Sequence, residues 1–186
     1  MLAVNTFAQT IELDTKASSL KWVGKKVGGS HNGTVAIESG SFELEGGKIT
    51  QGVALVDLTT IEDDDMSIFS PLRGKLVKHL KSEDFFDVER FPKAKFELKS
   101  FEVGEGGKTK VKGNLSVRGK TKPIEFLVDY KKSENEHHVL GKVTLDRTEW
   151  GLTFRSGKFF EKLGDKLIYD DFEVELDLKA TEKAKD

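Results

Sequence analysis

The chain has no cysteine among its 186 residues, and proline, tryptophan and tyrosine are scarce. Without cysteine, disulfides, thiolate metal sites and thiol catalysis are excluded. A surplus of one charge is also lacking: the net charge is -2, although 33% of residues are charged. A general polyanion binder would have a basic surplus, so we expect no nucleic-acid partner. No apolar run in the sequence is long enough to span a membrane.

What the sequence does contain is a long series of alternating apolar and polar residues. After Pro92 the alternation runs in segments that are joined by short glycine-rich turns, such as residues 104–107. Alternation with these turns indicates antiparallel strands with one apolar side. About eight such strands close most naturally on themselves, because closure removes exposed edges. The sequence therefore predicts an all-β fold, a lipocalin-like antiparallel β-barrel.

One segment, between Ile68 and Pro92, interrupts the alternation. Ser70 can cap a helix start, and Pro71 suits the first helical position because its missing N–H would be unpaired there anyway. The spacing predicts a helix over residues 71–80 that covers the sheet or the mouth of the barrel. Its apolar face is predicted to contain Phe69, Leu72, Leu76, Val77 and Leu80.

The volume inside the predicted barrel leaves two alternatives open. A barrel of about eight strands is just wide enough to be filled by side chains or to hold one slim ligand. Gly24, Gly113 and Gly141 occupy predicted inward positions, and almost no polar residue shares that side. These glycines either leave room for a hydrocarbon chain or relieve crowding in a packed barrel. The pattern by itself slightly favours the packed barrel.

Metal-binding and catalytic patterns are weak. Asp63, Asp64 and Asp65 precede the predicted helix without the spacing of a cation-binding loop, so we favour a solvated loop. His137 and His138 are neighbours on a strand and point to opposite faces, so they cannot hold one metal together. His31 alone makes no metal site. Neither a nucleophile–base–orienter set nor a phosphate-binding loop is visible, and we predict no catalytic residue, metal or cofactor.

Several segments, taken in order, resemble the YceI-like family. They are His79–Val88 with Phe91–Phe96, Gly113–Pro123 and Asp146–Leu152, and Trp22, His31 and Gly33 fit the opening of the family's sequences. The resemblance implies a lipocalin-like barrel over residues 10–180 whose lumen binds polyisoprenoids or similar long-chain amphiphiles. It also implies a periplasmic or secreted location. Residues 1–9 are then a disordered segment or a signal-peptide remnant, and residues 181–186 a disordered tail.

The resemblance favours an open lumen, and with it a non-catalytic carrier of a long-chain isoprenoid lipid, polyprenyl or quinone-like. Two alternatives are a surface-binding module with a solid core and an enzyme that acts on an apolar substrate in the same lumen. A homodimer is a further partner to test. The candidate ligand-binding residues are apolar groups expected to face the lumen and two arginines suited to a diphosphate or quinone oxygen: Trp22, Phe42, Leu76, Leu80, Phe85, Phe86, Phe96, Phe126, Arg147 and Arg155.

Plainer roles are also open for these residues. Core packing is the default for any one of the apolar side chains. Phe85 and Phe86 can anchor the helix, close the apolar tunnel, or do both. Arg147 has acidic neighbours, such as Asp146 or Asp171, with which it can pair. For His79 we favour a role at the helix C-terminus, where the helix dipole stabilises a cation, over ligand contact.

Overall fold

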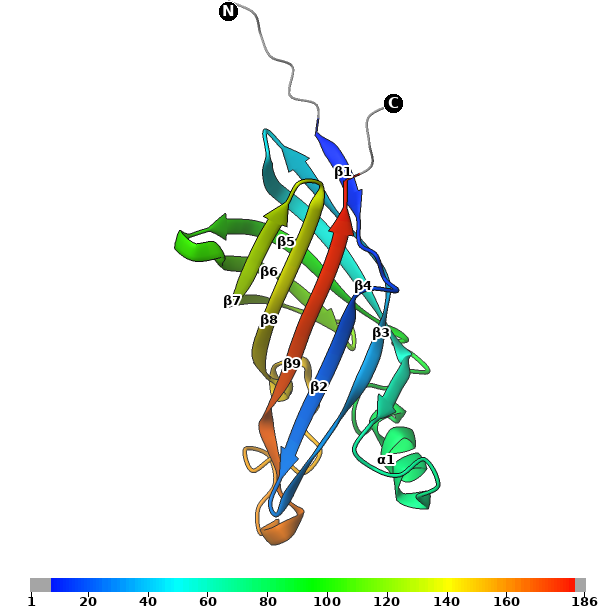
Figure 1. The fold of residues 1–186 in the computed structure, drawn as a ribbon. Helices are drawn as coiled ribbons and strands as arrows, with labels where there is room; N and C mark the ends of the chain where they lie inside the picture. The colour runs from blue at the N-terminus through cyan, green and yellow to red at the C-terminus, as the bar shows by residue number, and fades with distance from the viewer. Residues whose placement is uncertain (1–7, 183–186) are drawn as a thin grey trace, which may run out of the picture.

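The computed structural model describes residues 8–182, and its strands form one antiparallel sheet of nine strands (Figure 1). β1 begins and β9 ends one residue beyond the predicted boundaries of 10 and 180, and the rest of the predicted leader and tail, residues 1–7 and 183–186, lies outside the described residues. The strands are β1 (Gln9–Glu12), β2 (Ser19–Lys26), β3 (Gly29–Glu45), β4 (Lys48–Asp63), β5 (Lys93–Val103), β6 (Lys108–Val117), β7 (Lys120–Ser133), β8 (Glu136–Asp146) and β9 (Ile168–Thr181).

The sheet closes into a barrel through β3. The strand order is β1-β3-β2-β9-β8-β7-β6-β5-β4, and β3 also pairs with β4, so β2 to β9 form a closed ring of eight. The first part of β3 pairs with β2, and its later part, from Ser41 to Leu44, pairs with β1. Leu13, just after β1, then bridges to Ala180 on β9. The predicted barrel of about eight strands is confirmed, with β1 added as a ninth strand.

The two ends of the barrel are built differently (Figure 1). One end, which we call the helix end, holds the β2–β3 turn, the helix α1 (Pro71–Lys81) and residues 153–167. The other end, which we call the termini end, holds β1, the β3–β4 turn and the β7–β8 turn. Among residues 8–182, no helix has the length and apolar character needed to cross a bilayer.

The helix begins as the sequence predicts. The Ser70 hydroxyl accepts a hydrogen bond from the Leu72 N–H at 3.3 Å, and Pro71 is the first helical residue. The helix ends at Ser82, whose N–H donates to the carbonyl of His79. A hydroxyl at the N-cap typically stabilises a helix by about 1 kcal/mol. The predicted helix is therefore confirmed.

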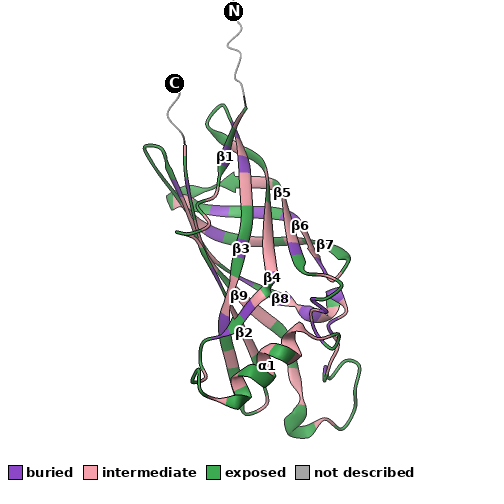
Figure 2. Ribbon diagram, turned by 90° about the vertical axis from the view of Figure 1, so that its right-hand side faces the viewer, coloured by how far each residue is buried: buried purple, intermediate pink, exposed green. Residues whose placement is uncertain are grey.

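The predicted apolar face of α1 is only half correct. Leu76 and Leu80 line the interior of the barrel, whereas Phe69 and Leu72 are 88% and 61% exposed. Figure 2 shows a helix without buried residues that lies beside the barrel wall. Its main contact among the strands is with β4, so only a narrow stripe faces the protein. A wide apolar face would require the helix to lie in a groove between two elements.

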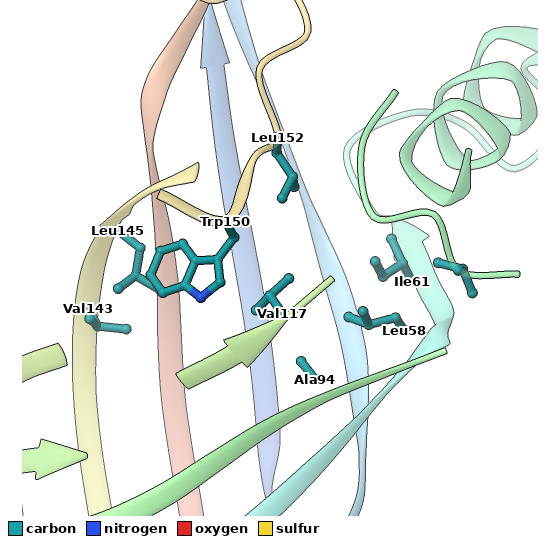
Figure 3. Close-up of a cluster of buried hydrophobic side chains, with 9 residues drawn as sticks. Leu58, Ile61, Ala94, Val117, Val143, Leu145, Trp150 and Leu152 are labelled. Carbon is teal, nitrogen blue, oxygen red and sulfur yellow. The ribbon is translucent and has the colours of Figure 1, made fainter. Parts of the chain in front are cut away.

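The main core lies between the middle of the barrel and the helix end. Trp150, in the short turn η2 (Arg147–Trp150), is 3% exposed, and its Nε1 donates to the Leu115 carbonyl at 3.0 Å. Figure 3 shows its indole among inward side chains from several strands. The cluster contains Leu58, Ile61, Val88, Ala94, Val117, Val143, Leu145, Trp150 and Leu152. A smaller cluster at the termini end contains Ile11, Phe42, Leu44 and Ala180.

Two of the three inward glycines do not open the lumen. A Cβ at Gly113 would lie 2.3 Å from the Phe96 ring, and a Cβ at Gly141 would lie 2.6 Å from Val128. These glycines admit a neighbouring side chain, so the expectation that they leave empty space is wrong. A Cβ at Gly24 would meet nothing closer than a Trp22 ring carbon at 4.0 Å, and Gly24 does line the interior space.

Candidate ligand-binding site

A cavity of about 510 Å³ lies inside the barrel, within the usual range for sites that bind small ligands. Its lining comes from every strand from β2 to β9 and from α1. It extends from Phe42 and Ala180 at the termini end to His79 and Arg155 at the helix end. The lining is predominantly aliphatic and aromatic. The packed-barrel alternative is therefore wrong.

All ten candidate ligand-binding residues contribute to this lining, and their contact with a ligand stays a prediction. They reach the cavity from four strands, from α1 and from the turns that follow α1 and β8. In chain order they are Trp22, Phe42, Leu76, Leu80, Phe85, Phe86, Phe96, Phe126, Arg147 and Arg155.

Aromatic rings form much of the wall in the middle of the cavity. Phe96 on β5 and Phe126 on β7 face each other with ring centroids 6.0 Å apart and an interplanar angle of 58°. Trp22 on β2 is fixed by its Nε1, which donates to the Glu62 carbonyl at 3.1 Å. Tilted rings at these distances make favourable contacts and present apolar faces. The wall is suited to a hydrocarbon chain.

A second aromatic group lies at the helix end. The His79 ring is 5.0 Å from Phe85 and 4.7 Å from Phe154, both edge to face, and Phe85 is 8% exposed. His79 lies in the last turn of α1, as predicted, and its Nε2 is 2.9 Å from Asp84 Oδ2. Phe154 lines the cavity too, and we did not predict it because it lies in an irregular segment without periodicity. This group joins the end of α1 to the segment after η2.

Arg147 is mainly a structural link at the cavity edge. Its Nε and Nη2 donate to the carbonyls of Tyr169 and Ile168 at 3.1 and 3.0 Å, and its Nη1 donates to the Leu152 carbonyl. Burial lowers the pKa of this guanidinium, which is 4% exposed as a residue. Its acidic partner is Asp170, at 3.4 Å, in place of the predicted Asp146 or Asp171. These bonds use most of its donors and leave few for a ligand head group.

Arg155 differs from Arg147 because it is exposed. Its guanidinium lies 5.0 Å from the centre of the Phe154 ring, over the ring face. Within residues 8–182 no carboxylate lies at ion-pair distance from it. Arg155 thus presents an unpaired cation at the helix end of the cavity, where an anionic or carbonyl head group could accept its hydrogen bonds.

At the termini end a buried polar network reaches the cavity. His137 is 3% exposed; its Nδ1 is 2.8 Å from the Tyr130 hydroxyl, and its Nε2 is 2.9 Å from Glu182 Oε1. Burial and the nearby Glu182 raise the pKa of Tyr130. His138 points outward to Asp177, so the prediction that the two histidines face opposite sides is confirmed. Both ring nitrogens of His137 are therefore engaged within this network.

A closed barrel of eight strands around an apolar cavity, with one helix at an end, defines a lipocalin-like binding fold. The family model of the YceI-like domain matches residues 12–180. The chain therefore belongs to the YceI-like family, as the sequence resemblance implies.

Relatives with curated sequences support the same assignment. The chain is 28% identical over 143 residues to a UPF0312 protein of Shewanella oneidensis, covering 77% of this chain and 63% of the relative. It is 36% identical over 102 residues to a UPF0312 protein of Photorhabdus laumondii, covering 54% of this chain and 44% of the relative. The matches thus span about half the length of these relatives.

Solved structures have the same fold. Burkholderia cenocepacia BcnA superposes with a TM-score of 0.71 at 17% identity, covering 91% of this chain and 99% of BcnA. A polyisoprenoid binding domain from Saccharophagus degradans, implicated in plant cell wall breakdown, gives a TM-score of 0.67 at 14% identity, covering 93% and 98%. At these identities the likeness shows the fold alone.

Proposed function

We propose that the chain binds a long-chain isoprenoid lipid, polyprenyl or quinone-like, in the lumen of the barrel and carries it without chemical change. The observation that supports this proposal most is the apolar cavity of about 510 Å³ along the barrel. The likeness to a polyisoprenoid binding domain from Saccharophagus degradans adds support for a lipid ligand.

The energetics favour a ligand with a long apolar tail. Removing apolar surface from water contributes about 25 cal/mol per Å², so a tail along the Phe96–Phe126 wall gains affinity along its whole length. A head group at the helix end would meet the free guanidinium of Arg155. The tail therefore supplies most of the affinity, and Arg155 supplies the preference for a polar, oxygen-bearing head.

The two alternatives receive less support. The cavity contradicts a surface-binding module with a solid core. No specific observation favours the enzyme alternative: the inward histidine at the termini end, His137, hydrogen-bonds to Tyr130 and Glu182 within the protein. A carrier requires no catalytic acid or base.

The test is a substitution of a cavity-lining residue that places a larger side chain inside the cavity. Gly24→Leu would place a side chain into open space, since a Cβ there has no neighbour closer than 4.0 Å. Purified protein would be loaded with a polyprenyl lipid and the bound fraction measured by native mass spectrometry and solvent extraction. We expect loading to fall at least about tenfold, because the added isobutyl group occupies ligand space.

Gly29→Leu is the matched control for this experiment. It introduces the same side chain at the start of β3, where a Cβ meets nothing within 4 Å and the residue does not line the cavity. Equal loading of both variants would overturn the lumen as the binding site. Repeated failure of the wild-type protein to retain any long-chain lipid would overturn the proposal itself.

The location and the oligomeric state stay predictions. A periplasmic or secreted protein would be recovered outside the cytoplasm when cells are fractionated. A homodimer would sediment at twice the mass of 20.7 kDa in analytical ultracentrifugation. Cytoplasmic recovery would contradict the first prediction, and a single monomeric species would contradict the second.

A further inference from the structure

Three metal-ligating side chains meet at the helix end, where β3 begins and β4 ends. His31 lies on β3, Asp63 is the last residue of β4, and Asp65 follows on the way to α1. The sheet register explains their meeting: Gly33 pairs with Asp63, which brings position 31 beside position 65. One ligand atom of each side chain lies within 4.8 Å of those of the other two. This cluster is separate from the polar network at the termini end.

The two carboxylates are oriented by main-chain amides. Asp63 Oδ1 accepts from the Met66 N–H at 2.9 Å, and Asp65 Oδ1 accepts from the Asn32 N–H at 3.0 Å. Each carboxylate therefore keeps its second oxygen for another partner. Those second oxygens face His31, whose Nδ1 lies 3.8 Å from Asp63 Oδ2 and 3.1 Å from Asp65 Oδ2. Outer contacts of this kind fix ligand orientation in metal sites.

The strongest evidence for a bound cation is the environment of Asp63. Its side chain is 0% exposed, and when Asp63 and Asp65 are both ionised no group donates a hydrogen bond to its Oδ2. The solvated loop predicted for residues 63–65 is therefore wrong at this residue. A buried carboxylate oxygen without a partner is strongly unfavourable, so such atoms are rare in folded proteins. The 3.8 Å gap to His31 is too long for a hydrogen bond, and a cation between the two would satisfy both.

We propose that His31, Asp63 and Asp65 bind one divalent transition-metal ion, with Zn²⁺ as the best-suited ion. Zinc binds imidazole nitrogen and carboxylate oxygen at about 2.0–2.2 Å in tetrahedral geometry, which places two ligand atoms about 3.4 Å apart. The two distances from His31 Nδ1, 3.1 and 3.8 Å, lie on either side of that value. One imidazole and two carboxylates leave a fourth position for water or another oxygen ligand.

The site also connects the cavity to α1. His31 lines the cavity, so the ion lies at the cavity edge. The main-chain carbonyl of Asp63 accepts from Arg73 Nε at 2.6 Å, and Arg73 on α1 also pairs with Glu62 at 3.0 Å. A metal ion at Asp63 therefore fixes the end of β4, to which α1 is attached. We expect the ion to hold the helix end together, since metal binding and folding are coupled.

The experiment titrates Zn²⁺ into chelator-treated full-length protein by isothermal calorimetry at neutral pH. The expected result is one saturable site per chain. Replacing a protein ligand, as in His31→Gln or Asp63→Asn, lowers the affinity at least about tenfold, since even outer-sphere changes have effects of that size. Asp64→Asn, in the same segment, and His138→Gln, an outward histidine, leave the affinity unchanged.

Two outcomes overturn the site. One is the absence of saturable binding to the wild-type protein; the other is an equal loss of affinity in His138→Gln and His31→Gln, which indicates histidine binding without a built site. Asp63→Asn is close in shape to the wild type, and circular dichroism verifies that each variant is folded. The visible absorption of bound Co²⁺ gives a second readout, with the intense tetrahedral bands expected in the wild type and lost in His31→Gln.

The lipid proposal is tested separately on the same proteins. Metal-free protein and His31→Gln are loaded with polyprenyl lipid as described above. Metal binding without lipid loading would overturn only the carrier function, and lipid loading without metal binding would overturn only the metal site.

Discussion

The two ends of the barrel are closed in different ways. At the termini end, β1 lies across the gap between β3 and β9, and Ile11, Phe42 and Leu44 pack there at 2–9% exposure. At the helix end, α1 buries no residue completely, and Phe159 in the following segment is 58% exposed. The termini end is closed by a small packed cluster, whereas the main core lies inside the helix end and the outermost element there, α1, has no buried residue (Figure 2).

This difference indicates which end of the barrel stays shut and which end a ligand can pass. Segments with few buried apolar contacts open at low free energy, whereas packed strands open only with the whole domain. A ligand in the cavity is therefore expected to enter and leave past α1 and residues 153–167, and the termini end is expected to stay shut. The predictions that follow compare the two ends, starting with the largest expected effect.

Truncating the core of the termini end should destabilise the whole barrel. Ile11 is 2% exposed, so Ile11→Ala should lower the free energy of unfolding by about 2–5 kcal/mol through lost burial and the cavity left behind. The rate of lipid transfer to acceptor vesicles should stay unchanged, because this end does not open. Urea unfolding and a fluorescent polyprenyl transfer assay measure the two effects. Faster transfer in Ile11→Ala would show that the termini end is also a route.

The corresponding change at the helix end should have a small effect on stability and a large effect on the rate of lipid transfer. Leu76 on α1 lines the cavity and is partly exposed, so Leu76→Ala should lower stability by only about 1 kcal/mol. It should speed lipid transfer several-fold, because it loosens the contact of α1 with the cavity. Leu72→Ala is the control, since Leu72 is 61% exposed and does not line the cavity. Equal transfer rates for both variants would place the exchange route elsewhere.

The barrel and the cavity wall could be predicted because they depend on a local pattern. Strands that alternate cleanly, such as β5 to β9, indicate by their pattern which residues face inward, and the wall residues Phe96 and Phe126 follow from that alternation alone. The capped start of α1 is equally local. These features need no knowledge of which strands are neighbours.

What could not be predicted depends on neighbours that are distant in the sequence. In the sequence Gly113 suggests empty space inside the barrel, but the pairing of β5 with β6 brings the Phe96 ring into that space. Phe69 and Leu72 fit a helical stripe, but the width of the wall that α1 meets decides which residues are covered. Asp63 looks solvated in a run of three aspartates, yet it extends β4 and faces inward, two residues after the buried Ile61. The alternation along β4, in which Asp63 shares a face with Ile61, could have predicted that Asp63 is buried.

The smallest effect concerns pH at the termini end. The hydrogen bond from Lys132 to Glu182, at 2.6 Å, and a second contact with His137 hold the pKa of the Glu182 carboxyl below its ordinary value, although burial opposes the shift. A lowered carboxyl pKa stabilises the fold above the ordinary value near 4.5, and this contribution is lost as the pH falls through the folded-state value. Glu182→Gln should therefore reduce the difference in melting temperature between neutral and acidic pH.

The magnitude should be modest, below about 1 kcal/mol, since Glu182 is near the surface and such ion pairs are weak. Glu136→Gln, at an exposed position next to His137, is the control and should keep the wild-type pH dependence. Melting temperatures from pH 7 down to about pH 3, below the ordinary glutamate pKa, measure the effect. If Glu182→Gln kept the full acid sensitivity, that sensitivity would come from other carboxyl groups with lowered pKa values, such as Asp146 near the helix end and Glu173 on β9.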